Sequence, residues 1–190
     1  MVGRGIAPGR KRLFVIDGAK ALRSGIDAVY GKDNPVQRCR NHKIRNVEGY
    51  LPKELGEYTT LSMKAAFKLD ADEGMKRLET LAESLSKAHP DAAASLREGL
   101  SEMFTVNRPG LPKVLCRSLG TTNIIESSFS GSKSRTHRVK RWRDGSMVKR
   151  WAASSLLSTE KSFRRIMGYK DLWMLEAALK EDIDNSEKAA

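Results

Sequence analysis

The sequence predicts a mixed α/β fold that is mostly helical. Two short segments near the start of the chain, the apolar residues 13–16 and the possible strand at residues 34–39, are each followed by a helical pattern. Such alternation is typical of a parallel sheet covered by helices. From about residue 52 onward the pattern is helical only, which predicts an all-helical unit after the strand-containing one.

The first predicted strand, residues 13–16, is short, apolar and β-branched toward its end. The helix that follows, residues 17–31, has apolar residues at three- and four-residue steps and ends at a glycine. These apolar residues are Ala19, Leu22, Ile26 and Val29. A second strand is predicted over residues 34–39 and a basic helix over residues 40–51.

Two apolar stripes at helical spacing mark residues 53–117 as all-helical. The stripes consist of Met63, Phe67, Met75, Leu78, Leu81, Ala82 and Leu85, and of Ala93, Leu96, Leu100, Met103 and Phe104. Amphipathic helices bury such faces against one another. We therefore expect these residues to form a core rather than to line a ligand site.

After the loop that ends the two stripes, the pattern predicts further helices. The stretch "LGTTNIIESSFSG" predicts a helix start with Thr121 or Thr122 at the N-cap. A later helix is predicted from Met147 to about Met167. It offers Trp151, Leu156, Phe163 and Ile166 for packing. Residues 169–190 are expected to form a C-terminal helix and a polar tail.

The 190-residue chain has 35 Lys and Arg residues against 23 Asp and Glu residues, and its formal net charge is +12. In residues 133–150 eight basic residues face one acidic residue, Asp144. The eight are Lys133, Arg135, Arg138, Lys140, Arg141, Arg143, Lys149 and Arg150. The stretch is either a solvated face or a surface for nucleic-acid phosphates, and Trp142 either stacks on bases or packs in a core.

The composition also bears on the compartment in which the protein works. No window approaches the about 18 apolar residues that a membrane helix needs. The first residues are basic but lack the apolar centre of a secretion signal. We therefore expect a cytoplasmic protein that does not contact membranes.

Two acidic residues stand where chemistry is common in α/β proteins. Asp17 directly follows the first predicted strand, and functional residues gather at the carboxyl ends of parallel strands. Glu126 lies in the first turns of a later helix. Carboxylates are ligands that Mg²⁺ prefers. However, an Asp-Gly after a strand also makes a turn, and a Glu at a helix start also favours the helix dipole, so both interpretations stay open.

Cys39 and Cys116 are too few for a disulfide framework in a chain of this kind. Cys39 precedes His42 by three residues, so both can lie on one helical face or across a strand end and the following turn. A structural zinc site needs about two more ligands. Since His89, His137 and Cys116 show no matching spacing, we expect Cys39 and His42 to support or position the site rather than to bind metal.

Three motifs, in this order, resemble the Mutator-type transposases of bacterial insertion sequences. They are "IDGAKAL", "VQRCRNHKIRNV" and "TTNIIES", and the similarity extends to "WRDGSMVKRWAASS" and "FRRIMGY". The resemblance implies an RNase H-like catalytic domain with an all-helical insertion. The domain would be formed by residues 1–52 and 118–168, and the insertion by residues 53–117.

The resemblance also implies an Asp-Asp-Glu (DDE) triad that binds two Mg²⁺ ions. Such a site cleaves double-stranded DNA at the element ends and joins these ends to target DNA. By motif match, Asp17 is the second acid and Glu126 the last, both as metal ligands. Cys39 and His42 match the family's Cys-x-x-His signature. The expected location is the bacterial nucleoid, with the chain itself or a full-length transposase as a further partner.

The family's first acid lies on an earlier strand, whereas residues 1–12 contain no acidic residue. We therefore expect a sheet that is incomplete at its N-terminal side, and a carboxyl-terminal portion of a transposase that is inactive alone, because two acids of three cannot build the site. One alternative is a non-catalytic DNA-binding module that modulates the full-length transposase. Another is a pseudogene product that folds poorly because an open sheet edge is exposed.

Overall fold

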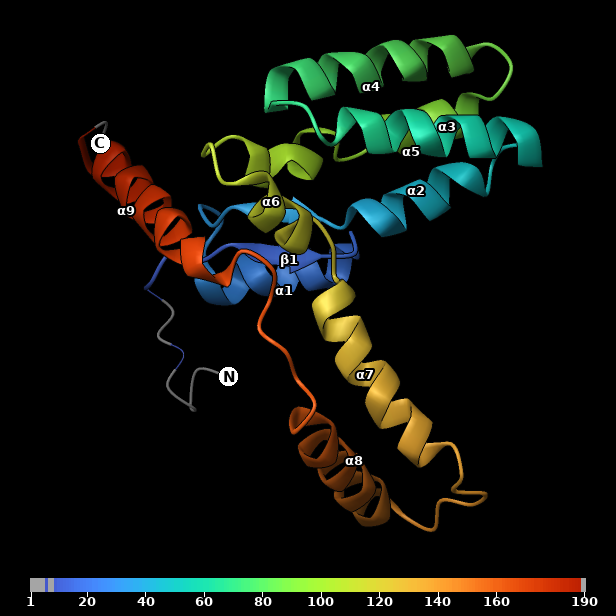
Figure 1. Ribbon diagram of the computed structural model, residues 1–190, viewed down its shortest axis with the longest axis vertical. Coiled ribbons are helices and arrows are strands. Elements are labelled where there is room, and N and C mark those ends of the chain that lie inside the picture. Colours follow the sequence, from blue (N-terminus) through green and yellow to red (C-terminus); the bar gives the residue numbers. More distant parts are fainter. Residues whose placement is uncertain (1–5, 7–8, 189–190) are drawn as a thin grey trace.

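The computed structural model describes residue 6 and residues 9–188. The chain is mostly helical with one small sheet, as expected from the sequence pattern (Figure 1). The elements follow the predicted order of strand, helix, strand and helix, and then helices only. Among the helices that the structure describes, none is both long and apolar enough to cross a membrane.

The sheet consists of two parallel strands, β1 (Phe14–Ile16) and β2 (Val36–Arg38), which are joined by helix α1 (Lys20–Tyr30). The register pairs the first residues of the two strands with each other and the last residues with each other. β1 ends before Gly18, whose φ of 100° is a conformation that favours glycine. β2 follows Pro35, which has no backbone N–H to donate to a ladder.

A small apolar core lies between α1 and the sheet. Ile26 of α1 packs with Ile16 of β1 and Val36 of β2. Of the apolar stripe predicted for this helix, Ile26 is buried, whereas Leu22 and Val29 are 48% and 47% exposed. Two strands of three residues are too narrow to cover the whole stripe.

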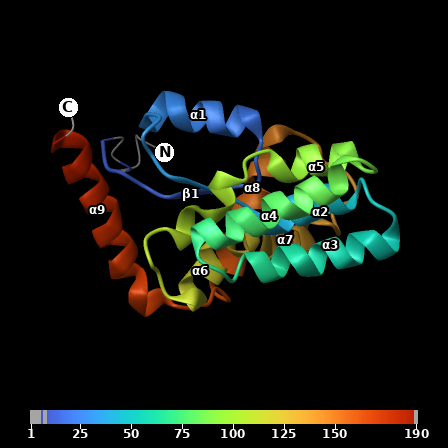
Figure 2. The same ribbon diagram turned by 90° about the horizontal axis from the view of Figure 1, so that it is seen from above.

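Four helices and a 3-10 helix form the largest body of the molecule (Figures 1 and 2). They are α2 (Arg40–Glu48), α3 (Lys53–Ala66), α4 (Ala71–Ser86), α5 (Pro90–Arg97) and the 3-10 helix η2 (Ser101–Asn107). Every residue of the two predicted stripes belongs to their core or packs against it, so that prediction is confirmed. Each fully buried Leu or Phe side chain there contributes about 1.5–3 kcal/mol.

Gly74 sets the distance between α4 and its neighbours. A Cβ atom at this position would lie 2.2 Å from Cε1 of Phe104 and 2.9 Å from the carbonyl oxygen of Ala66. Both are shorter than any ordinary contact, so only glycine permits this packing. The position lies inside a helix, where glycine is otherwise unfavourable.

We expect Gly74→Ala to lower the free energy of unfolding by about 1–3 kcal/mol, because the added methyl group collides with a fully buried ring. Gly25→Ala is the matched control, since it lies in α1 with nothing within 4 Å of its Cβ position. That change should raise the stability by about 0.5–1 kcal/mol. Urea unfolding of both variants measures the difference, and equal effects would contradict the packing described here.

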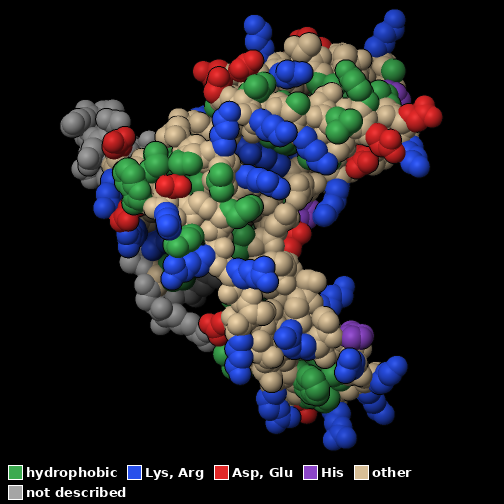
Figure 3. All heavy atoms as spheres, in the orientation of Figure 1, with side chains coloured by type: hydrophobic (Ala, Val, Ile, Leu, Met, Phe, Trp, Pro, Cys, Tyr) green, Lys and Arg blue, Asp and Glu red, His purple; other side chains and the backbone are tan. Residues whose placement is uncertain are grey.

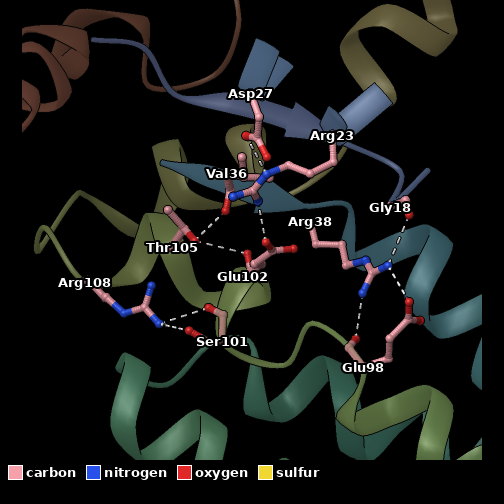
Figure 4. Close-up of polar contacts among 10 residues, drawn as sticks. All are labelled: Gly18, Arg23, Asp27, Val36, Arg38, Glu98, Ser101, Glu102, Thr105 and Arg108. Atoms are coloured by element: carbon pink, nitrogen blue, oxygen red, sulfur yellow. Dashed lines mark hydrogen bonds and ion pairs between the residues drawn. The ribbon is translucent and has the colours of Figure 1, made fainter. Parts of the chain in front are cut away.

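Polar side chains, rather than apolar ones, join the sheet to the body of helices. Gln37 is fully buried, donates to the carbonyl oxygen of Met103 (2.9 Å) and accepts from the N–H of Val106 (3.1 Å). Thr105 of η2 donates to the carbonyl oxygen of Val36 at 2.7 Å (Figure 4). The side chain of Gln37, the middle residue of β2, is thus buried with its polar atoms hydrogen-bonded to η2.

Two buried cations share one carboxylate at this junction. Arg38 donates to the carboxylate and carbonyl oxygens of Glu98 and to the carbonyl oxygen of Gly18 (Figure 4). Nζ of Lys43, whose side chain is 2% exposed, lies 3.2 Å from the Glu98 carboxylate and 2.6 Å from the carbonyl oxygen of Ser95. The hydrogen bond from Arg38 lowers the pKa of Glu98, and burial lowers the pKa of Lys43.

We expect Glu98→Gln to destabilise the protein by about 1–2 kcal/mol, because it leaves two buried cations without their carboxylate while the site stays partly solvated. Since the folded pKa of Glu98 is lowered, its contribution is present above the usual value of 4.5 and is lost as pH falls through the folded value. The difference between wild type and variant should therefore shrink in acid.

Glu79→Gln provides the control, because Glu79 pairs with Arg97 at 2.6 Å on the surface. Exposed pairs contribute little, so this variant should change stability by less than about 0.5 kcal/mol. Urea unfolding at neutral and acidic pH measures both variants. A loss at Glu79 as large as that at Glu98 would count against a special role for the buried cations.

The remainder of the chain is helical and less compact. It contains α6 (Lys113–Leu119), α7 (Asn123–Thr136), α8 (Gly145–Glu160), the 3-10 helix η3 (Tyr169–Asp171) and α9 (Leu172–Lys188). A second core joins α6 and α9 to the start of the chain. α9 includes most of the stretch predicted as a polar tail, and residues 189–190 lie outside the described residues.

α7 and α8 form a hairpin, residues 123–160, that projects from the rest of the molecule and is called the arm below (Figure 1). α8 ends at Glu160, so the prediction of a helix reaching Met167 was wrong. The chain leaves the helix there, which allows Ile166 to reach the second core. Trp151 and Phe163, which the sequence offered for packing, are 43% and 54% exposed.

Candidate functional site

The candidate site lies at the carboxyl end of the two parallel strands. Asp17 follows β1 and Cys39 follows β2. The N–H of Cys39 donates to the carbonyl oxygen of Ile16 at 2.7 Å, so the backbones of the two positions are neighbours. This is the edge at which open α/β sheets present functional residues.

Asp17 has an observed structural role at this edge. Its side chain is exposed, and Oδ1 accepts a hydrogen bond from the N–H of Ala19 at 3.0 Å. This local contact stabilises the turn that leads into α1. The turn interpretation of Asp17 is thus correct, and it leaves the carboxylate accessible to solvent.

Glu126 reaches the same edge from a distant part of the sequence. The N–H of Arg40 donates to the carbonyl oxygen of Gly120 at 3.0 Å, which fixes the start of α2 against the loop before α7. Glu126 lies in the first turn of α7, and its Oε1 is 3.6 Å from Nδ1 of His42. The structure therefore brings Glu126 beside the Cys-x-x-His signature.

Thr122 connects the three side chains. Its hydroxyl lies 3.2 Å from Sγ of Cys39 and 3.4 Å from Nδ1 of His42, and it donates to Oε1 of Glu126 at 2.5 Å. Thr122 occupies the predicted N-cap position of α7 but makes no side-chain cap hydrogen bond. Its spacing of four residues from Glu126, which places both on one helix face, was the signal that could have revealed this role.

The two cysteines have different electrostatic environments. Burial raises the pKa of Cys39, but hydrogen bonds from the Thr122 side chain and from the backbones of His42 and Thr122 outweigh it, so the pKa lies below its usual value. Cys39 is also the N-cap residue of α2, where the helix dipole favours a thiolate. By contrast, burial raises the pKa of Cys116, whose thiol donates to two backbone carbonyls.

The donor set does not by itself fit magnesium. Within the described part of the chain, the metal-capable group is Cys39, His42 and Glu126, whose ligand atoms lie within 4.8 Å of one another. Mg²⁺ demands oxygen ligands in near-octahedral geometry, whereas this set offers sulfur, nitrogen and oxygen. Asp17 is near this group in the backbone but is not part of it.

The eight basic residues of the predicted stretch are all exposed. They lie at the end of α7, in the connecting loop and in the first turns of α8, and thus at the tip of the arm (Figure 3). Asp144, the one acid among them, caps α8 by accepting from the N–H of Met147 at 2.6 Å, which lowers its pKa. Trp142 is 41% exposed, so it is not a core residue.

Sequence reasoning missed an open groove of about 1800 Å³. Its walls come from the end of α3, from α6, from the first half of α7 and from residues 162–167. The lining includes Lys64, Lys68, Lys113, Arg117, Arg164 and Arg165. None of the six forms an ion pair with any residue that the structure describes. They come from distant segments, so no run of charge in the sequence announced them.

Comparison with known proteins agrees with the motifs at this site. The family model described as "Transposase, Mutator family" matches residues 1–165. The transposase for insertion sequence element IST2 of Acidithiobacillus ferrooxidans is 27% identical over 129 residues, which cover 67% of this chain and 43% of that protein. The match therefore spans less than half of that relative. Because the family model extends over most of the chain, this protein belongs to the Mutator family of transposases.

Proposed function

We propose that this chain contributes Asp17 and Glu126 to the DDE catalytic site of an insertion-sequence transposase that cleaves DNA and transfers strands. The observation that supports this most directly is the position of Glu126. The contact between Thr122 and Cys39 spans 83 positions and places Glu126 at the edge where Asp17 follows its strand.

The proposed fold is an RNase H-like domain interrupted by a helical insertion. The pair of parallel strands with Asp17 at the carboxyl end of β1 is consistent with this. The helices between residues 53 and 107 have a large core, which also includes Ile44 and Val47 of α2. In this proposal residues 1–52 and 118–168 form the catalytic domain and residues 53–117 form the insertion.

Two Mg²⁺ ions are the proposed cofactors of the complete site, where they would stabilise the charge of the reacting phosphodiester. The described residues do not gather the three carboxylates that such a site uses, and residues 1–12 contain no acid. We therefore propose that this chain does not cleave DNA by itself. The protein would act at the bacterial nucleoid, together with its own copies or with a longer transposase.

The prediction about DNA cleavage has two parts. The chain alone, incubated with Mg²⁺ and DNA that contains the element ends, should give no nicks above the protein-free background. A hybrid that adds the preceding portion of the IST2 transposase should restore cleavage. In that hybrid Asp17→Asn and Glu126→Gln should each lower the rate by at least about 100-fold.

Asp33→Asn and Glu160→Gln are the matched controls in the same hybrid. Both acids are exposed, one before β2 and one at the end of α8, so cleavage should stay near the unmodified rate. Cleavage by the chain alone that Asp17→Asn abolishes would refute the incomplete site. If this chain binds DNA and its addition lowers cleavage by a longer transposase, the chain is instead a regulatory module.

We propose that double-stranded DNA lies against the tip of the arm and extends toward the groove. The tip presents its basic side chains to solvent with one acid among them, and that acid is already occupied as a helix cap. The groove lining, in which six exposed basic residues outnumber the acids Asp70 and Glu73, continues this positive charge toward the body of the molecule. Contacts of this kind position a duplex and do not read its sequence.

If six basic residues contact phosphates, the logarithm of the association constant for DNA should fall linearly with the logarithm of the salt concentration, with a slope of about −5. Changing Arg138, Lys140, Arg141 and Arg143 together to Gln should reduce that slope by about 3–4. The matched control changes four other exposed basic residues to Gln and alters the net charge equally. They are Lys53 in α3, Lys76 and Arg77 in α4, and Lys87 directly after α4. A filter-binding titration measures both, and equal losses in the two variants would reject a local interface.

A further inference from the structure

We infer that Cys39, His42 and Glu126 form a binding site for a zinc-like transition-metal ion. Their ligand atoms, a thiol sulfur, a ring nitrogen and a carboxylate oxygen, all lie within 4.8 Å of one another. This combination is one that Zn²⁺ accepts and Mg²⁺ does not. The site forms from the end of β2, the first turn of α2 and the first turn of α7.

The spacing of the donors is close to what the ion requires. Bonds of about 2.0–2.3 Å in a tetrahedral site separate neighbouring ligand atoms by about 3.5 Å. Nδ1 of His42 and Oε1 of Glu126 are already 3.6 Å apart. The widest pair must close by about 1 Å, which partly exposed His42 and Glu126 side chains can provide by rotation.

Thr122 indicates where the three donors converge. Its hydroxyl lies within hydrogen-bond distance of all three side chains, so these side chains are directed toward one small volume. In the metal-bound form the ion would replace these hydrogen bonds, and the hydroxyl would move aside or become a neighbour of the ion. Cys39 is fully buried and is held by the start of α2, which gives the site one rigid ligand.

The number of ligands defines the kind of site. Structural zinc sites use four protein ligands, whereas sites with three protein ligands keep a position for water. His42 and Glu126 are 33% and 40% exposed, which leaves that fourth position open to solvent. We therefore assign an exchangeable site rather than a permanent structural one.

Metal binding here has a consequence for the reaction, and this part rests on the proposed function. Glu126 cannot serve a zinc-like ion bound to Cys39 and His42 and at the same time the Mg²⁺ ions of a catalytic site. Occupancy of the Cys-x-x-His site would thus remove the last acid of the triad. Zinc would then inhibit cleavage even in an excess of magnesium.

Cobalt provides the direct test, because Co²⁺ takes zinc sites and reports thiolate ligation by a charge-transfer absorption band. The full chain should bind one Co²⁺ with this band, and added Zn²⁺ should displace it. Cys39→Ser should abolish the band. His42→Ala should weaken Co²⁺ binding by at least about 100-fold, and Glu126→Gln by about 10–100-fold.

Two control variants isolate the site. Cys116→Ser removes a buried thiol that hydrogen-bonds to backbone carbonyls, and His137→Ala removes a histidine at the end of α7, and neither residue belongs to the cluster. Both variants should keep the band and the affinity. Circular dichroism shows whether each variant is folded. Serine rather than alanine replaces Cys39 because it nearly preserves the volume of this buried side chain.

The inference fails if folded wild-type protein shows no thiolate band, or if the band persists in Cys39→Ser or disappears in Cys116→Ser. The inhibitory consequence is measured separately in the cleavage-competent hybrid, as the ratio of cleavage rates with and without zinc. In the hybrid, the cleavage rate with zinc should be at least about 10-fold lower than the rate without zinc. In its Cys39→Ser variant the two rates should be nearly equal. Cobalt binding without any cleavage by the hybrid would overturn the proposed function and leave the metal site intact.

Discussion

Three cations from one short segment, Arg38, Arg40 and Lys43, are buried where the sheet meets the body of helices, and the rest of the structure depends on how they are satisfied. A buried cation is costly unless it is well hydrogen-bonded. Arg40 donates to the carbonyl oxygen of Met103 and lies over the ring of Phe67, and burial lowers its pKa to about 10. Because Glu98, Met103 and Phe67 belong to the body of helices, these contacts couple the carboxyl end of β2 to that body.

The sequence was most informative where periodicity reflects burial. The two core stripes were predicted because their apolar spacing matches the buried face of each helix, whereas in α1 the same spacing left Leu22 and Val29 exposed. The burial of Lys43 was not predictable, since a basic residue at the start of a basic helix has the pattern of a surface residue. Its partner Glu98 lies 55 positions away, and no local rule joins them. The role of Thr122 was hidden in the same way behind its position as an N-cap.

The choice between a turn residue and a metal ligand at Asp17 is not an exclusive one. One oxygen of its carboxylate stabilises the turn into α1, and the side chain remains exposed at the sheet edge. The motif match identified Glu126, Cys39 and His42 as its companions. In the structure Glu126 lies beside Cys39 and His42, and Asp17 is not a member of this group. The sequence singled out Cys39, His42 and Glu126 one by one, but their proximity depends on the contact between the loop before α7 and the start of α2.

The arm differs from the body of helices in what lies between its helices. Ser132 contacts Ser155 there, and Gly131 faces Thr159, while α7 has no buried residue at all. Separating α7 from α8 would expose little apolar surface, whereas separating the helices of the body would expose its large apolar core. The seam of the arm thus contributes less hydrophobic free energy than the core of the body of helices. In the DNA complex proposed above, contacts at the tip would spend part of the binding free energy on stiffening these two helices.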